Sequence, residues 1–284
     1  MCGTMKRRNG TRYIPFITLS LSEPKPRIWI TLSGCNFKCK GCFSVARDSV
    51  GVPMTVDRLI NWVEESNRAY NNNIGPLEEA IITGGEPTLA KAFLRDLVLN
   101  LKMRVGVKHI TLSTNGYLLD REFVMELKDI GLNEVKLDIK AYNDSIHKWY
   151  TGMSNRPVLK AARNLCECKL DFRVETVLMP RIVDVAEIER IASFLARIDP
   201  EIKYRVVKFA PGEAREKVTR RPSDDEIKLA VNSASKYLLN VAGGKACVHA
   251  ATEPRAEGTK KWVRVYPDMK TETIIAKPGG FRVS

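Results

Sequence analysis

The sequence predicts an α/β protein built around a parallel β-sheet, and three observations support this prediction. Short runs rich in Val, Ile and Leu recur along the chain, and most of them end near glycine, asparagine or proline. Stretches with apolar residues at helical spacing separate these runs. Strand–helix alternation repeated six times is typical of βα units that pair in parallel. The length of 284 residues fits one such domain with extra segments.

Six strands are expected, each short and rich in β-branched residues. Their near-continuous apolar runs predict that both faces of the sheet are covered. The expected strands are Arg27–Ser33, Ala80–Thr83, Ile110–Ser113, Val135–Ile139, Phe172–Met179 and Tyr204–Phe209.

Six helices are expected between and after these strands. The first opens at Thr55, a residue type that caps helix N-termini, and carries apolar residues at helical spacing. The expected helices are Thr55–Arg68, Ala90–Leu101, Asp120–Ile130, Pro157–Cys168, Asp184–Ile198 and Ser223–Leu238.

The two ends of the chain differ from this central part. Residues 1–26 are expected to form an N-terminal extension, and residues 27–240 the main domain. Residues 241–284 are expected to form a small β-rich appendage, with short strands at Lys245–His249, Lys261–Tyr266 and Glu272–Ile275.

The net charge of +13 predicts attraction to an acidic partner, such as nucleic acid, an acidic protein or a phosphorylated metabolite. A surface rich in Lys and Arg, as in thermophilic proteins, is the alternative explanation. No apolar run is long enough to cross a membrane, and none follows the basic N-terminus as in a signal peptide. We therefore expect a cytoplasmic protein without a membrane partner.

Three of the seven cysteines lie within eight residues, as Cys35, Cys39 and Cys42. This CxxxCxxC spacing begins directly after the first expected strand, on a loop of the type that forms the functional face of parallel barrels. Three soft thiolates indicate a metal site, either zinc or an iron–sulfur cluster. A closed zinc site needs a fourth ligand that this loop lacks, whereas a four-iron cluster held by three thiolates keeps one iron open.

Further motifs make the pattern specific. Gly84-Gly85-Glu86-Pro87 follows the second strand, Thr114-Asn115-Gly116 the third and Asp138-Ile139-Lys140 the fourth, with Thr151-Gly152-Met153-Ser154-Asn155 beyond. Together with the cysteines, these motifs resemble the radical S-adenosylmethionine (SAM) superfamily over residues 27–212. Within it, the sequence most resembles the activating enzymes of pyruvate formate-lyase and of anaerobic ribonucleotide reductase. The resemblance implies a partial (β/α)6 TIM-like barrel.

The resemblance also implies cofactors and their ligands. Cys35, Cys39 and Cys42 would hold a [4Fe-4S] cluster, and SAM would bind its open iron. The backbone of Gly84, Gly85, Glu86 and Pro87 would accept the methionine amino group, because glycines permit close approach and carbonyls accept ammonium hydrogens. Asp138 and Lys140 would orient the methionine, Ser113 and Asn115 would contact ribose or methionine groups, and Gly41 and Phe43 would flank the adenine.

Three positions depart from the family pattern. Gly41 stands where many relatives have an aromatic residue, and Ser113 stands where pyruvate formate-lyase activases have an aspartate of a cation site. Lys208-Phe209-Ala210-Pro211 lacks the histidine that some relatives place against adenine. Cys2, Cys166, Cys168 and Cys247 could together form an auxiliary cluster, although Cys166 and Cys168 are expected at the opposite rim of the barrel.

The implied reaction is reductive cleavage of SAM to a 5′-deoxyadenosyl radical, which abstracts hydrogen from a substrate. A low-potential ferredoxin or flavodoxin would supply the electron, and no general acid or base is expected. The substrate is either a glycyl-radical protein or, given the charge, a tRNA or nucleotide-like molecule. The basic residues behind this second hypothesis are Lys203, Arg205, Lys208, Arg215, Lys217, Arg220 and Arg221. A zinc-stabilised RNA-binding protein is the non-enzymatic alternative.

Overall fold

The computed structural model describes residues 10–21, 25–244, 260–277 and 280–283. They form a two-stranded sheet, β1-β4, and an eleven-stranded sheet ordered β10-β9-β8-β7-β6-β5-β3-β2-β11-β12-β13. The strands are β1 (Arg12–Ile14), β2 (Ile17–Ser20), β3 (Arg27–Leu32), β4 (Val52–Met54), β5 (Glu79–Gly84), β6 (His109–Thr114), β7 (Glu134–Asp138), β8 (Asp171–Leu178), β9 (Lys203–Lys208), β10 (Val241–Gly244), β11 (Lys260–Val265), β12 (Thr271–Lys277) and β13 (Gly280–Val283).

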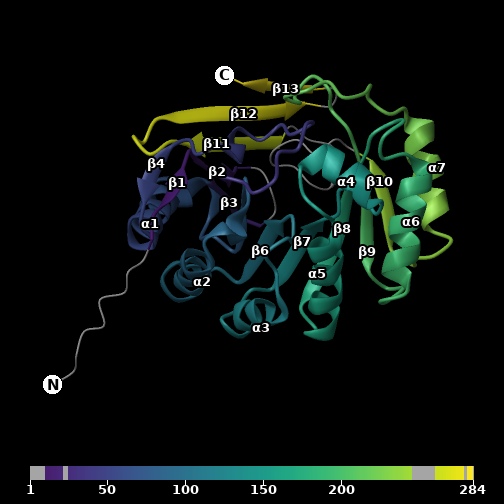
Figure 1. The fold of residues 1–284 in the computed structure, drawn as a ribbon. Helices are drawn as coiled ribbons and strands as arrows, with labels where there is room; N and C mark the ends of the chain where they lie inside the picture. Colours follow the sequence, from purple (N-terminus) through teal and green to yellow (C-terminus); the bar gives the residue numbers. More distant parts are fainter. Residues whose placement is uncertain (1–9, 22–24, 245–259, 278–279, 284) are drawn as a thin grey trace.

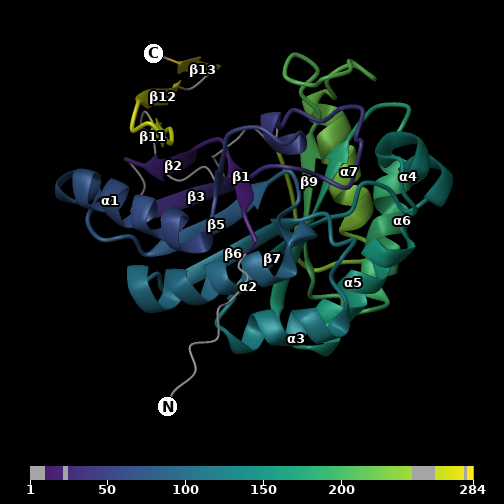
Figure 2. The ribbon, with the colours of Figure 1, turned by 60° about the vertical axis from the view of Figure 1, so that its left-hand side comes forward.

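The helices follow the outer side of the curved sheet, as the two views show together (Figures 1 and 2). The N-cap expected at Thr55 is present, since its hydroxyl accepts from the backbone N–H of Arg58 at 3.3 Å. One helix, α4, was not expected from the sequence. The α-helices are α1 (Val56–Ile74), α2 (Lys91–Asn100), α3 (Arg121–Asp129), α4 (Asp144–Thr151), α5 (Arg156–Glu167), α6 (Val185–Ala196) and α7 (Asp224–Ala234).

The six expected strands are β3 and β5 to β9, and they pair in parallel in that spatial order. β10 continues the parallel part of the sheet beyond β9. On the opposite edge, β2 and then β11 to β13 pair antiparallel. This mixed α/β architecture with a mainly parallel sheet confirms the predicted fold class. The strand expected at Lys245–His249 lies outside the described residues.

The two faces of the parallel strands differ more than the sequence led us to expect. In β7, Val135 and Leu137 are fully buried, while Glu134, Lys136 and Asp138 alternate with them and are half-buried on the other face. The neighbouring strand β8 adds Glu175, whose carboxylate lies 3.1 Å from Lys136. This face of the sheet is therefore covered but polar, and a polar face can line a site for a polar ligand.

None of the helices in the described part of the chain is both long and apolar enough to span a membrane.

Candidate functional site

A pocket lies where the parallel strands end, at the edge that carries the βα loops. Every predicted site residue lines it except Glu86 and Pro87, so the structure brings together segments that are more than 100 residues apart in sequence. The lining residues are Cys35, Phe37, Cys39, Gly41, Cys42, Phe43, Ser44, Thr83, Gly84, Gly85, Ser113, Thr114, Asn115, Asp138, Lys140, Tyr150, Val177, Lys208, Phe209 and Ala210.

The three predicted metal ligands lie on the loop that follows β3, at one side of this pocket. Burial raises the pKa of the Cys35 thiol to about 11 and that of the Cys39 thiol to about 12. Both thiols are therefore protonated at neutral pH, so the predicted ligation of a metal would release protons. The side-chain amide of Asn115 ties the loop to β6, because its Nδ2 donates to Asn36 Oδ1 at 2.8 Å.

The C-terminal end of α4 holds one side of the cysteine loop through backbone hydrogen bonds. The N–H of Lys38 donates to the carbonyl of Thr151 at 2.7 Å, and the N–H of Lys40 to that of Tyr150 at 3.0 Å. These contacts fix the segment that carries Cys39 without using any side chain. The loop therefore depends on where α4 lies.

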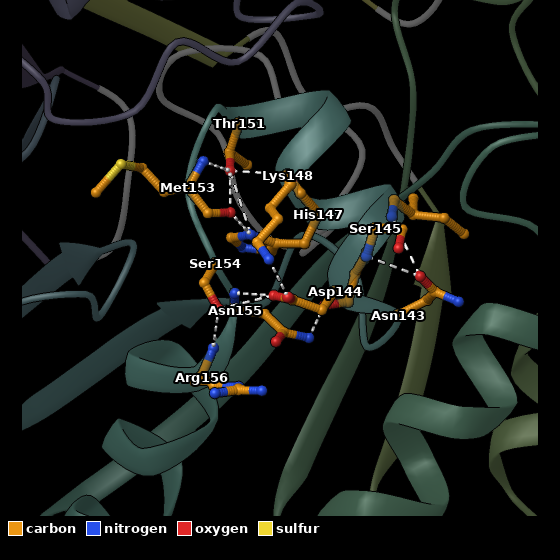
Figure 3. A network of polar contacts seen from close by, with 12 residues as sticks. Asn143, Asp144, Ser145, His147, Lys148, Thr151, Met153, Ser154, Asn155 and Arg156 are labelled. Carbon is orange, nitrogen blue, oxygen red and sulfur yellow. Dashed lines mark hydrogen bonds and ion pairs between the residues drawn. The ribbon is translucent and has the colours of Figure 1, made fainter.

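The motif at residues 151–155 sets the position of α4 (Figure 3). Asp144 in the first turn of α4 accepts from Ser154 Oγ at 2.8 Å and from the backbone N–H of Asn155 at 2.9 Å. Lys148 lies 2.7 Å from the same carboxylate. These three donors, with Lys148 contributing most, hold the pKa of Asp144 well below its usual range. The motif thus links the first turn of α4 to the segment that directly follows its C-terminal end.

The segment after β9 holds the other side of the cysteine loop. The N–H of Arg215 donates to the carbonyl of Cys42 at 2.9 Å, and the N–H of Glu216 to that of Lys40 at 3.1 Å. The cysteine loop is therefore held from two directions, by α4 and by the segment after β9. This leaves the three thiols on the pocket side.

Gly84 and Gly85 occupy positions with no room for a side chain. A Cβ on Gly84, whose φ is +133°, would lie 2.1 Å from the carbonyl oxygen of Leu32. One on Gly85 would lie 2.2 Å from the carbonyl oxygen of Gly34. The two glycines let the loop after β5 pack directly against the end of β3 and the start of the cysteine loop.

Glu86 is fully buried behind the pocket wall, where its carboxylate joins two loops. Its Oε1 accepts from Thr88 N–H at 3.0 Å, from the Thr88 hydroxyl at 2.6 Å and from the Thr114 hydroxyl at 2.6 Å. Its Oε2 accepts from the N–H of Asn115 at 2.7 Å. Burial raises the pKa of Glu86, and these four hydrogen bonds act to lower it. The side chain thus fixes the loop after β5 to the loop after β6, and the backbone of the Gly-Gly-Glu-Pro segment remains the part predicted to contact a ligand.

The N-terminal extension reaches this region through Arg12 of β1. Its side chain is buried, and the guanidinium donates to the carbonyl of Ser33 at 2.6 Å and to that of Glu86 at 3.2 Å. Burial lowers the pKa of Arg12, and the nearby Glu86 and Cys35 oppose this effect. Sequence reasoning missed this residue, because an isolated arginine in an extension gives no signal of what it will contact.

Asp138 and Lys140 form an ion pair at the pocket wall, with Lys140 Nζ 3.0 Å from Asp138 Oδ2. Burial by itself would lower the pKa of Lys140, but the charge of the Asp138 carboxylate and its hydrogen bond to the ammonium group oppose this effect, and the pKa is raised. The ammonium group therefore stays charged. The pair offers one cation and one anion to a zwitterionic ligand, which is the form of an amino-acid group such as methionine.

The structure explains the glycine at position 41. A Cβ there would lie 2.7 Å from the ring of Phe209 and 3.0 Å from the hydroxyl of Tyr150. Gly41 therefore allows two aromatic side chains to approach the cysteine loop. Tyr150 and Phe209 line the pocket but were not predicted as site residues. The sequence features that could have indicated them are the position of Tyr150 directly before the motif at 151–155 and the position of Phe209 at the end of a strand.

The basic run at residues 203–221 does not form a continuous cationic surface. Arg205 lies 3.8 Å from Glu175, Arg215 lies 2.7 Å from Asp48, and Arg220 lies 2.7 Å from Glu226. Lys208 is paired with Asp224. Four of the seven basic residues are therefore engaged with carboxylates of the same chain, which weakens the argument for a nucleic-acid surface here.

Cys166 and Cys168, the remaining cysteines in the described part of the chain, do not line the pocket. Cys168 follows α5, and its thiol donates to the carbonyl of Arg121 at 3.8 Å. Cys166 lies on the last turn of α5, which precedes the start of β8 and so lies at the rim opposite the pocket. Cys2 and Cys247 lie outside the described residues.

The chemistry of the donor set fits an iron–sulfur cluster. A four-iron cluster takes each thiolate on a different iron, which suits three cysteines of one loop that line the same pocket. The fold and this site together define an α/β protein in which three thiols and an ion pair line one pocket at the ends of the parallel strands.

Comparison with known proteins gives the family. Residues 29–195 match the radical SAM superfamily. A Methanocaldococcus jannaschii protein assigned as a glycyl-radical enzyme activating enzyme is 36% identical over 231 residues, which cover 79% of this chain and 82% of that protein. The chain therefore belongs to the radical SAM superfamily, whose enzymes use a [4Fe-4S] cluster and SAM.

Other similarities are weaker. A pyruvate formate-lyase-activating enzyme of Staphylococcus epidermidis is 27% identical over 77% of this chain and 91% of its own length. A GTP 3′,8-cyclase of Haemophilus ducreyi is 29% identical over 60% of this chain and 49% of its own length. A radical SAM methyltransferase structure from Sphaerobacter thermophilus has a TM-score of 0.63 at 18% identity, over 81% of this chain and 70% of that one, and this similarity shows the fold.

Proposed function

We propose that this chain is an activating enzyme that forms a glycyl radical on a partner polypeptide. The observation that carries the proposal is that the three thiols of one loop line the same pocket as Gly84, Gly85 and the Asp138–Lys140 pair. The relative assigned as an activating enzyme matches over most of both chains, which favours this activity over that of the cyclase, whose similarity covers about half of the relative.

In this proposal Cys35, Cys39 and Cys42 hold the cluster through three of its irons. When bound and reduced, the cluster and SAM supply a 5′-deoxyadenosyl radical that abstracts a hydrogen atom from the target. The loop has few ways to move, because α4 and the segment after β9 both hold its backbone. A fixed loop keeps the reacting atoms in one geometry.

The polar residues of the pocket are proposed to bind the methionine part of SAM. Lys140 would neutralise the carboxylate and Asp138 would accept from the ammonium group. Backbone carbonyls of the Gly84–Pro87 segment would accept the remaining ammonium hydrogens. Ser113 and Asn115 are proposed to contact ribose or methionine groups.

The apolar residues are proposed to bind the adenosine and to exclude water. Gly41 and Phe43 would flank the adenine, and the structure adds Tyr150 and Phe209 as aromatic neighbours of Gly41. Exclusion of water protects a reactive intermediate from side reactions. A low-potential ferredoxin or flavodoxin is proposed as the electron donor, and the cytoplasm stays the predicted compartment.

The test is 5′-deoxyadenosine release by anaerobically reconstituted, reduced enzyme, with cell extract treated beforehand with protease or ribonuclease. We expect stimulation that survives ribonuclease and is lost with protease. The stimulating polypeptide should then show a glycyl-radical signal in electron paramagnetic resonance. Stimulation that survives protease but is lost with ribonuclease would overturn the proposal in favour of an RNA substrate.

A further inference from the structure

A large aromatic side chain lies exposed directly behind the cysteine loop. Trp149 is 49% exposed, whereas its neighbour Tyr150 is buried and lines the pocket. The ammonium group of Lys40 lies 5.5 Å from the centre of the Trp149 ring, within the range of a cation–π contact. The indole therefore forms part of the outer surface at the place where Lys40 of the cysteine loop reaches that surface.

The connection from this surface to the metal ligands is short. Lys38 and Lys40 flank Cys39 in sequence, so their Cα atoms lie about 3.8 Å from that of Cys39. The backbone N–H of each is hydrogen-bonded to the end of α4 that carries Trp149, at 2.7 and 3.0 Å. A molecule bound over these residues would be separated from the cluster by little more than one layer of chain.

The charge of this surface is positive. Lys38 is exposed, and Lys40 and Lys148 have side chains that are 34% and 58% exposed. The acidic side chains in contact with these cations are Glu216, 3.5 Å from Lys40, and Asp144, 2.7 Å from Lys148. The three lysines outnumber the two carboxylates that contact them, so this surface keeps a net positive charge beside the exposed indole. Such a surface is complementary to a partner with an acidic face and an apolar centre.

We propose that Lys38, Lys40 and Trp149 form the docking surface for the protein that reduces the cluster, and that this partner is an acidic, low-potential one-electron carrier. This inference rests on the cluster assigned to Cys35, Cys39 and Cys42 in the proposed function. In the step concerned, the carrier loses one electron and the cluster gains it, and no bond forms or breaks.

The experiment uses the full chain with its cluster and two reductants, a flavodoxin hydroquinone as the protein donor and dithionite as the small-molecule donor. Cluster bleaching is followed by anaerobic stopped-flow absorbance for the wild type, Lys38→Glu, Trp149→Ala and the control Lys160→Glu. Lys160 is exposed on α5, away from the cysteine loop, and its substitution makes the same change in charge.

We expect Lys38→Glu to slow reduction by flavodoxin about tenfold or more and to weaken its dependence on salt, because charge reversal removes electrostatic steering. Trp149→Ala should slow it several-fold with the salt dependence retained. Dithionite, a small anion, should reduce Trp149→Ala at the wild-type rate and should respond to Lys38→Glu far less than flavodoxin does. Lys160→Glu should match the wild type with both donors.

Equal rates of flavodoxin reduction in all four proteins would overturn the inference. So would an equal slowing with dithionite, because the residues would then act on the cluster itself. A loss confined to stimulation by the substrate polypeptide would assign the surface to the substrate instead. Since cluster bleaching needs neither SAM nor substrate, failure to find a glycyl radical on any partner would count against the proposed function and leave this measurement unaffected.

Discussion

The two loops that meet at the pocket are built in different ways. The loop after β5 is held by its own side chains and by contacts that leave no space, with Gly84 and Gly85 against β3 and the Glu86 carboxylate accepting four hydrogen bonds. The cysteine loop is held through its backbone by α4 and by the segment after β9.

Because of this difference, we expect substitutions in the loop after β5 to change the stability of the fold, and substitutions of the thiols to change metal binding and activity. A change in the loop after β5 must disturb packing, because its atoms already touch the backbone of β3. A change to a thiol of the cysteine loop removes a proposed metal ligand and leaves the backbone contacts that hold the loop in place. Four substitutions test this contrast, from the largest expected effect to the smallest.

Cys39→Ser should abolish activity while leaving the metal-free fold intact. We expect 5′-deoxyadenosine formation to fall by more than about 10³-fold, because hydroxyls are poor ligands for iron–sulfur clusters. The free energy of unfolding of the metal-free protein should change by less than about 1 kcal/mol. Iron content and urea unfolding measure the two effects. Cys166→Ser, on α5, is the control that should keep both iron and activity, and normal iron content in Cys39→Ser would contradict the assignment.

Gly84→Ala should instead lower the stability of the metal-free protein. The new Cβ would meet the Leu32 carbonyl in a backbone conformation that disfavours side chains, so we expect a loss of about 2–4 kcal/mol in the free energy of unfolding. Urea unfolding of the metal-free protein measures it. Gly212→Ala is the matched control, since nothing lies within 4 Å of a Cβ at that position. A change below about 0.5 kcal/mol would show that the loop adapts.

Glu86→Gln should act between these two extremes. One carboxylate oxygen becomes an amide N–H₂ that faces the N–H of Asn115, so this buried donor loses its acceptor, at a cost of about 1–3 kcal/mol. We expect lower stability and weaker SAM binding, with the cluster retained because all three thiols are unchanged. Denaturant unfolding and equilibrium binding of SAM to the cluster-loaded protein measure the effects. Loss of the cluster with unchanged stability would contradict this interpretation.

Asp144→Asn should give the smallest effect, confined to α4 and dependent on pH. The pKa of Asp144 is held low in the folded protein, so its contribution to stability is present above its unfolded pKa of about 3.9 and is lost as pH falls through its folded pKa. Hydrogen exchange of the α4 amides should therefore speed up as pH falls below about 4, after correction for intrinsic rates. The substitution should remove this dependence, whereas Asp225→Asn, on α7, should retain it.

The sequence predicted the parallel strands and most helices because apolar periodicity depends on local residue order. It also predicted most pocket residues, because motifs that directly follow parallel strands must meet at one edge of the sheet. It did not predict α4, whose first-turn Asp144 bonds to residues beyond its own end. Nor did it predict that four residues of the basic run would form ion pairs with Glu175, Asp48, Glu226 and Asp224.

The sequence by itself determined the chemistry of this protein, since cysteine spacing and strand-end motifs specify the donor atoms and the edge of the sheet on which they lie. The tertiary structure decided what each of the other side chains does. Arg12, Glu86 and Tyr150 have their roles through contacts with segments distant in sequence. The physical reason is that ligand chemistry is a property of side-chain type, whereas hydrogen bonding and burial depend on which segments the fold brings together.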